Sequence, residues 1–142
     1  MIVYADLSFL VSSYTADAHS TEADNRRALL PTILITPFVR AEVCTALHTQ
    51  VFQGRVSLAQ ANRAWQDFEQ DGGNGALTRI DFLLAALDLA VDLAKRFAPT
   101  LGVRTLDSLH VACALALNAE RFWTFDDRQA KLDEAVGLDT AA

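Results

Sequence analysis

Short runs of β-branched and aromatic residues, separated by longer helical patterns, constrain the fold of this chain most strongly. The clearest runs are residues 2–5, 32–36 and 122–125, and residues 76–80 are a further candidate. Short apolar runs bounded by turn signals are typical of buried strands. Strands that alternate with helices form βαβ crossovers, which produce a parallel sheet with helices on both faces. We therefore predict an α/β fold with a central, mostly parallel sheet of four to five short strands flanked by helices.

The segments between these runs carry the periodicity and end signals of helices. Ser57 and Thr105 are candidate N-caps, and Pro99 with Gly102 is expected to end the helix that precedes them. The glycine-rich segment 71–75 is expected to be a flexible loop, because it lacks the lysine and hydroxyl residue of a phosphate-binding loop. The predicted helices cover residues 7–14, 22–30, 37–52, 57–68, 82–97, 105–118 and 127–136.

Composition limits the class of protein. With 142 residues and no linker, repeat or low-complexity tract, we expect a single domain over residues 1–142. No apolar run approaches the roughly 20 residues of a membrane helix, so a cytoplasmic protein without membrane contact is expected. Cys44 and Cys113 lack partners at zinc spacing and are expected in the core. A net charge of −6 argues against binding nucleic acid by bulk positive charge, but it does not exclude a nuclease whose acids bind cations.

Two aspartates directly follow predicted strands. Asp6 comes after residues 2–5, and Asp126 comes after residues 122–125. The carboxyl ends of parallel strands meet at one edge of the sheet, where ligands bind. Aspartate is also a common helix cap, so a structural role for either residue alone is equally compatible with the sequence.

Two further acids lie on apolar rows of predicted helices. Asp107 is the only charged residue between positions 106 and 119, and Glu42 lies about one turn into the helix that follows Pro37. A buried, unpaired carboxylate is costly unless a cation compensates it or its pKa rises. A salt bridge from Arg104, one turn earlier, is the structural alternative for Asp107.

Strand ends and helix starts direct these acids to one edge of the sheet. Carboxylates gathered there would repel one another, and hard divalent cations with oxygen ligands, Mg²⁺ or Mn²⁺, would remove the repulsion. Such ions activate water and stabilise the leaving oxygen in phosphodiester hydrolysis. The converging acids are Asp6, Glu42, Asp107 and Asp126. Other acids have the spacing of solvent-exposed positions, namely Glu69, Asp71, Asp88, Asp92, Asp133 and Glu134.

Neighbouring polar residues are candidates for supporting roles. Ser8 and Thr124 could orient carboxylates or water, although capping and strand-edge hydrogen bonds explain them equally well. Arg40, Arg104 and Arg128 could contact substrate phosphates, and each has an equally good interpretation as a surface residue.

Four segments, in the expected order and spanning nearly the whole chain, resemble the PIN domain family. Within it, they are similar to the VapC-type ribonuclease toxins of toxin–antitoxin pairs. The most specific pair is LDSLH and TFD, whose acids are 19 residues apart. The segments are YADLS (4–8), VRAEV (39–43), LDSLHVA (106–112) and WTFDDR (123–128).

The resemblance implies a magnesium-dependent endoribonuclease that uses the same four acids as its metal ligands. It also implies an antitoxin protein that blocks the site, and a homodimer. Leu7 stands where a small hydroxyl residue is frequent in the family. Asp127, next to Asp126, makes the fourth ligand ambiguous, although alignment to Thr124 favours Asp126.

Two other functions remain open from the sequence. A haloacid-dehalogenase-like phosphohydrolase also places an aspartate after its first strand, but it needs a second acid where Ser8 stands and gives no task to Glu42 or Asp107. A catalytically inactive PIN-like module that binds RNA or protein is the second alternative. The presence of all four acids disfavours it.

Overall fold

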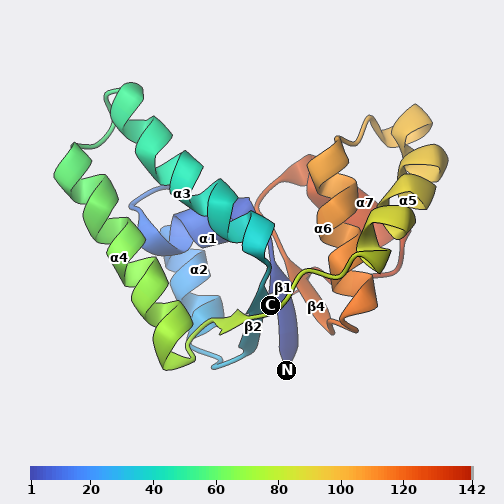
Figure 1. Ribbon diagram of the computed structural model, residues 1–142, viewed down its shortest axis with the longest axis horizontal. Coiled ribbons are helices and arrows are strands. Elements are labelled where there is room, and N and C mark those ends of the chain that lie inside the picture. The colour runs from blue at the N-terminus through green and yellow to red at the C-terminus, as the bar shows by residue number, and fades with distance from the viewer. Residues whose placement is uncertain (142) are drawn as a thin grey trace.

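A four-stranded parallel sheet forms the centre of the protein, as predicted. The computed structural model describes residues 1–141. The strand order is β3-β2-β1-β4, and every neighbouring pair is parallel (Figure 1). Three strands are shorter than predicted, and β4 ends before Thr124. The strands are β1 (Ile2–Ala5), β2 (Thr32–Ile35), β3 (Thr78–Arg79) and β4 (Arg121–Trp123).

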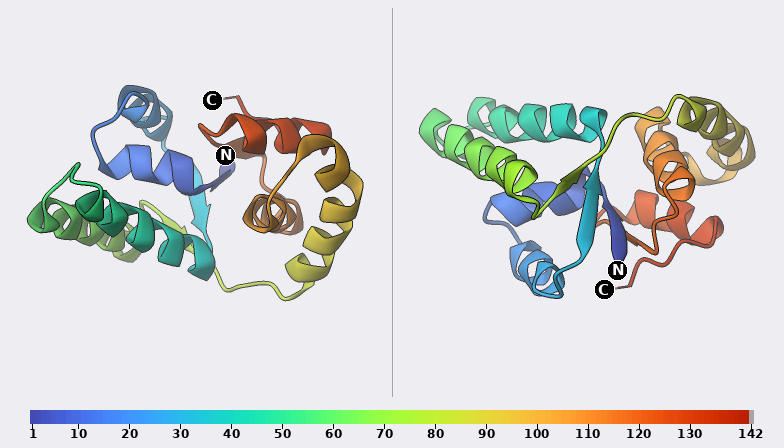
Figure 2. Two further views of the ribbon diagram at one scale, coloured as in Figure 1. Left: turned by 90° about the horizontal axis from the view of Figure 1, so that it is seen from above. Right: turned by 60° about the horizontal axis from the view of Figure 1, so that its bottom comes forward.

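Helices cover both faces of the sheet (Figure 2). Helices α1 to α4 lie on one side, and α5 to α7 lie on the other, as the two views show. Within residues 1–141, no helix is both long and apolar enough to cross a membrane. The helices are α1 (Leu7–Tyr14), α2 (Ser20–Arg27), α3 (Pro37–Phe52), α4 (Leu58–Asn74), α5 (Ala85–Leu101), α6 (Thr105–Ala116) and α7 (Asp127–Ala135).

Two hydrophobic cores result from the alternation of side chains along β1. Val3 and Ala5 belong to the core formed with α1 to α4, whereas Tyr4 belongs to the core formed with α5 to α7. In β4, Trp123 joins the first core and Phe122 joins the second. Successive side chains of a strand point to opposite faces, so a strand buried on both faces must be apolar throughout. This explains why the predicted strands are continuous apolar runs.

Residues 71–74 of the glycine-rich segment are helical, and the prediction of a loop there was wrong. Helix α4 continues to Asn74 and ends at Gly75, which has a φ of 89°. Asp71 fixes the last turns, because its carboxylate accepts hydrogen bonds from Tyr14 Oη at 2.5 Å and Arg27 Nη2 at 2.9 Å. Tertiary contacts therefore override the low helix propensity of the glycines.

Two predicted helix ends also differ. Helix α5 continues past Pro99 and ends at Gly102, whose φ is 64°. Thr105 is the first residue of α6 and does not cap it. The preceding Arg104 occupies the cap position, and its backbone N–H donates to Asp107 Oδ2 at 2.9 Å.

Asp133, expected on a solvent-exposed face, is completely buried in α7, with 0% of its surface exposed. Its Oδ1 accepts a hydrogen bond of 2.8 Å from Gln129 Nε2, while Oδ2 has no partner among the described residues. Burial raises the pKa of Asp133 from 3.8 to about 8, and the nearby negative charges of Asp6, Asp107 and Glu134 add to the rise. This carboxyl is therefore largely protonated at neutral pH.

This burial predicts how stability depends on pH. The folded state retains a proton that the unfolded state loses, so stability should decrease as pH rises from about 4 towards about 8. The side-chain amide introduced by Asp133→Asn would imitate the protonated carboxyl without titrating. We expect this variant to remove up to about 1 kcal/mol per pH unit of the decrease and to raise the melting temperature at pH 7.5. Chemical unfolding from pH 5 to pH 8 measures the effect.

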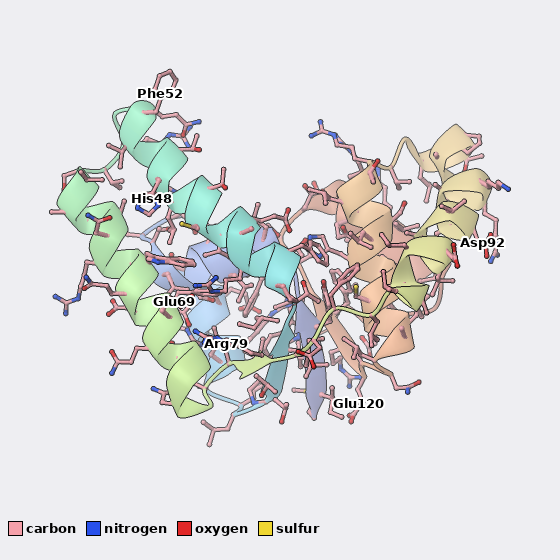
Figure 3. All side chains as sticks on the ribbon, in the orientation of Figure 1. His48, Phe52, Glu69, Arg79, Asp92 and Glu120 are labelled. Carbon is pink, nitrogen blue, oxygen red and sulfur yellow. The ribbon has the colours of Figure 1, made fainter. Side chains whose placement is uncertain are left out.

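Asp92→Asn is the matched control, because Asp92 is exposed on α5 and labelled there in Figure 3. This variant should retain the pH dependence of the wild-type protein. Parallel stability curves for Asp133→Asn and the wild type would contradict a protonated Asp133.

Candidate active site

The four acids singled out from the sequence line one cleft, although they come from separate parts of the chain. The cleft has a volume of about 470 Å³ and lies at the carboxyl ends of β1 and β4. Helices α1, α3, α6 and α7 contribute the remaining walls. Its acidic lining consists of Asp6, Glu42, Asp107 and Asp126.

Asp6 is the most buried of these acids, with 5% of its surface exposed. Its Oδ1 accepts hydrogen bonds from Ser8 Oγ at 2.7 Å and from the Phe9 backbone N–H at 3.2 Å. Its Oδ2 accepts a hydrogen bond of 2.6 Å from Thr124 Oγ1. Burial raises the pKa of Asp6, and the hydrogen bonds from Thr124 and Ser8 oppose that rise because they favour the ionised form.

The two hydroxyl groups also join β1 to the segment that follows β4. Ser8 Oγ accepts a hydrogen bond of 2.8 Å from the Phe125 backbone N–H. Thr124 Oγ1 accepts one of 3.0 Å from the Asp126 backbone N–H. Each hydroxyl thus donates to Asp6 and accepts from the chain that leads into α7. The positions of Asp6 and Asp126 are therefore coupled through Ser8 and Thr124.

Glu42 is positioned beside a histidine that is itself held by a tyrosine. Tyr4 Oη is 2.8 Å from His110 Nδ1, and His110 Nε2 is 2.9 Å from Glu42 Oε1. A Tyr4 hydroxyl that donates to Nδ1 places the imidazole N–H on the side of Glu42. Glu42 Oε1 is buried and accepts no well-oriented hydrogen bond from the described residues. It is an acceptor oxygen with unused capacity.

Asp107 and Asp126 combine a capping role with a place in the cleft. Asp107 binds the Arg104 backbone N–H, as described above, and Asp126 Oδ1 accepts a hydrogen bond of 3.0 Å from the Gln129 backbone N–H. Within residues 1–141 the Arg104 guanidinium forms no ion pair, so the salt bridge considered for Asp107 is absent there. In each of these acids, the second carboxylate oxygen takes no part in the capping hydrogen bond.

The acids do not form a closed set of ligands as they stand. No three His, Cys, Asp or Glu side chains in the described part of the chain are close enough together to hold a metal ion. The chemistry of the lining nevertheless fits a hard cation, because the available donors are carboxylate oxygens and one of them, Glu42 Oε1, is buried without a hydrogen bond. Binding an ion there would require the carboxylates to approach one another.

The remaining polar lining includes a residue that sequence reasoning missed. Gln129 is 1% exposed and lines the cleft, and its Nε2 donates to Asp133 Oδ1 and, at 3.4 Å, to the Asp107 backbone oxygen. It therefore connects α7 to α6 beneath the acids. The available signal was the polar pair Gln129 and Asp133, four residues apart on one face of a helix.

Of the three arginines suggested as phosphate ligands, only Arg104 lines the cleft. Arg40 instead pairs with Glu69 at 2.6 Å and lies over the ring of Trp65. Glu69 also pairs with Arg79 at 3.1 Å, and Figure 3 shows these two side chains next to each other. Arg128 is exposed on α7 outside the lining residues.

Solved structures share this fold. VapC20 from Mycobacterium tuberculosis, described as a toxin that cleaves the sarcin–ricin loop, has a TM-score of 0.75 at 16% identity, with 98% of each chain covered. A VapBC2 structure from Rickettsia felis, bound to a DNA fragment from their promoter, has a TM-score of 0.69 at 20% identity, covering 99% of this chain and 98% of that one.

PAE2754 from Pyrobaculum aerophilum has a TM-score of 0.66 at 18% identity, covering 93% of this chain and 79% of that one. Comparison with curated protein sequences found no significant match. The model of the PIN domain family matches residues 3–135, from β1 to the end of α7. The chain therefore belongs to the PIN domain family.

Proposed function

We propose that this protein is a magnesium-dependent endoribonuclease and the toxin of a toxin–antitoxin pair. The observation that carries the proposal is the convergence of the four acids, from separate elements of a PIN fold, on one cleft. PIN nucleases usually use divalent metal ions. A solved neighbour, VapC20, is itself described as an RNA-loop-cleaving toxin.

Asp6, Glu42, Asp107 and Asp126 would hold Mg²⁺, and Mn²⁺ could substitute because it accepts the same oxygen ligands. When bound, the cation supplies an activated water and stabilises negative charge on the leaving oxygen. Glu42 Oε1 lies 2.9 Å from His110 Nε2 but accepts no well-oriented hydrogen bond, so it retains capacity for this role. Asp6 would be a ligand whose orientation the hydrogen bonds from Ser8 and Thr124 already fix.

The chain's own groups would prepare the site for a phosphodiester. Ser8 and Thr124 hold the Asp6 carboxylate in one rotamer, so its reorganisation on binding is small. His110, fixed by Tyr4, limits the movement of Glu42 in the same way. Within the described part of the chain, Arg104 is the one arginine or lysine that lines the cleft, and its guanidinium forms no ion pair there and can bind a phosphate oxygen.

The haloacid-dehalogenase alternative is not supported. Position 8 would have to supply an acid, whereas the Ser8 hydroxyl donates a hydrogen bond to Asp6. The family match also assigns the fold to the PIN domain. The first experiment below distinguishes the proposed ribonuclease from an inactive module that only binds RNA or protein.

The antitoxin and a second copy of the chain are the proposed protein partners. The VapBC2 structure from Rickettsia felis is that of a toxin–antitoxin complex. A dimer is supported by an exposed apolar face on and just before α5, where the exposed fractions are 76% for Leu84, 44% for Leu87 and 54% for Val91. Exposed apolar patches of this kind mark protein interfaces.

The first prediction concerns catalysis. Asp107→Asn should abolish Mg²⁺-dependent RNA cleavage, with a loss of at least about 100-fold, because it removes charge from the site. The fold should persist, since the amide oxygen of the substituted side chain can still accept the hydrogen bond from the Arg104 N–H. In metal-free buffer the variant should be at least as stable as the wild type, because repulsion among the acids is reduced. RNA-end mapping and thermal unfolding measure both effects.

The control for this experiment is Asp92→Asn, which makes the same chemical change on the exposed surface of α5. It should cleave RNA like the wild type. Full activity of Asp107→Asn would refute the assignment of the site. A wild-type protein that binds RNA without cutting it would establish the inactive-module alternative instead.

The second prediction concerns the metal. Mg²⁺ or Mn²⁺ should raise the melting temperature of the wild-type protein, because an ion that binds only the folded state stabilises it. Glu42→Gln should lose most of that shift, since it removes the negative charge of a carboxylate that lines the acidic cleft. Differential scanning calorimetry with and without EDTA is the measurement. Equal shifts in the two proteins would exclude Glu42 as a ligand.

The third prediction concerns assembly. Leu84→Glu should convert a dimer into a monomer, because it places a charge on the exposed apolar face at α5. Leu58→Glu is the matched control, since Leu58 is 58% exposed at the start of α4, away from α5. Light scattering coupled to size-exclusion chromatography determines both masses. A monomeric wild-type protein, or a dimeric Leu84→Glu variant, would contradict the interface.

A further inference from the structure

We propose that the RNA substrate leaves the acidic cleft along the exposed face of α3 and that Arg55, in the loop after α3, binds one of its phosphates. This inference rests on the proposed ribonuclease function and extends it beyond the reacting phosphate. It identifies the substrate as a single strand that is bound over several nucleotides on one side of the cleavage point.

The first support is a second cleft that adjoins the acidic one. It has a volume of about 550 Å³ and shares Leu7 and Glu42 with the acidic cleft. From Glu42 it continues along α3 to Gln53 and then to Arg55. A helix rises about 1.5 Å per residue, so this path is about 15 Å long from Glu42 to the end of α3. A ligand bound at the acids can therefore extend along a continuous surface from Glu42 towards the end of α3.

The second support is the chemistry of this surface. Thr45, Thr49 and Gln53 follow one another at intervals of four residues, so they lie on one face of the helix. All three are exposed, and Gln50 lines the same cleft. Among residues 1–141, Glu42 itself is the one carboxylate that lines it. The Thr45 hydroxyl donates to the Ala41 backbone oxygen at 2.9 Å and can accept from a 2′-hydroxyl. The Thr49 hydroxyl and the glutamine amides can also donate to phosphate oxygens, and none of these neutral groups repels the RNA backbone.

The third support is the distribution of ion pairs. Six of the ten arginines in the chain pair with carboxylates. Within the described residues, the side chains of Arg55, Arg96, Arg104 and Arg128 form no ion pair. Two of these line the connected clefts, Arg104 in the acidic cleft itself and Arg55 in the cleft that adjoins it along α3. In a chain of net charge −6, these two guanidiniums are placed where a polyanion would need them.

A protein segment is a poorer occupant of this surface. Protein interfaces are centred on buried apolar or aromatic anchors. The apolar lining of the α3 cleft consists only of Leu7, Ala41 and Ala46. The larger cleft of about 790 Å³, between α1 and the α3–α4 pair, contains the apolar side chains Val11, Leu47 and Phe125 and differs in this respect. The polar α3 cleft therefore fits a nucleic-acid strand better.

The experiment compares Arg55→Gln with Arg96→Gln, using RNA that the wild-type protein cleaves. Arg96 is also exposed and without an ion pair, but it lies on α5 and lines neither cleft. After the cleavage point is mapped, oligonucleotides of about 5 and about 15 nucleotides are made, the longer ones extended to the 5′ or to the 3′ side. Rates are measured over a range of salt concentrations.

Arg55→Gln should raise KM about tenfold on oligonucleotides extended to one side, leave kcat unchanged, and reduce the salt dependence by roughly one phosphate contact. It should have no effect on the short oligonucleotide, and Arg96→Gln should have none on either. Equal penalties on short and long RNA, or identical behaviour of the two variants, would overturn the proposal.

Two further outcomes are distinguishable from these. A wild-type protein that cleaves no RNA at all would remove the proposed function itself. Unchanged RNA kinetics in Arg55→Gln, together with loss of a co-purifying protein, would assign the α3 surface to a protein partner and overturn the inference alone.

Discussion

The burial of the Asp6 carboxylate at the end of β1 is the constraint on which the rest of this structure depends. A carboxylate that is 5% exposed must be hydrogen-bonded, and Ser8 and Thr124 supply those bonds from either side. The same hydroxyls accept from the backbone after β4, so satisfying Asp6 also fixes the course of the chain into α7. Burial of one acid thereby determines where Asp126 begins the last helix.

The other acids reach the cleft by a second physical rule, which concerns helix starts. Asp107 and Asp126 bind backbone N–H groups in the first turns of α6 and α7, where a helix favours negative charge. The capping role and the functional role, which looked like alternatives in the sequence, are thus compatible. A cap orients one carboxylate oxygen and leaves the second available, while it holds the side chain at the edge where parallel strands end.

Much of this arrangement could be predicted from the sequence, because continuous apolar strands and acids at their ends are local signals. What could not be predicted depended on tertiary contacts. Residues 71–74 are helical where Tyr14 and Arg27, both distant in sequence, bind Asp71. Asp133 has neighbours that suggest an exposed position, yet packing of α7 buries it and Gln129 satisfies one of its oxygens. The sequence does not distinguish Arg40 from Arg104 as a phosphate ligand, because the ion pair between Arg40 and Glu69 joins residues that are far apart in the chain.

The ion pairs also explain how a protein of net negative charge could bind a polyanion such as RNA. Binding that relied on overall charge would fail at a net charge of −6, but internal pairing neutralises most arginines and leaves a few at selected places. A guanidinium without a carboxylate partner binds phosphate more strongly than one already paired. In the proposed ribonuclease, affinity would come from the position of a few cations near the cleft, and the surplus of carboxylates would disfavour nucleic acid elsewhere on the surface. On such a surface, the positions of the unpaired arginines, and not the net charge, would decide where RNA can bind.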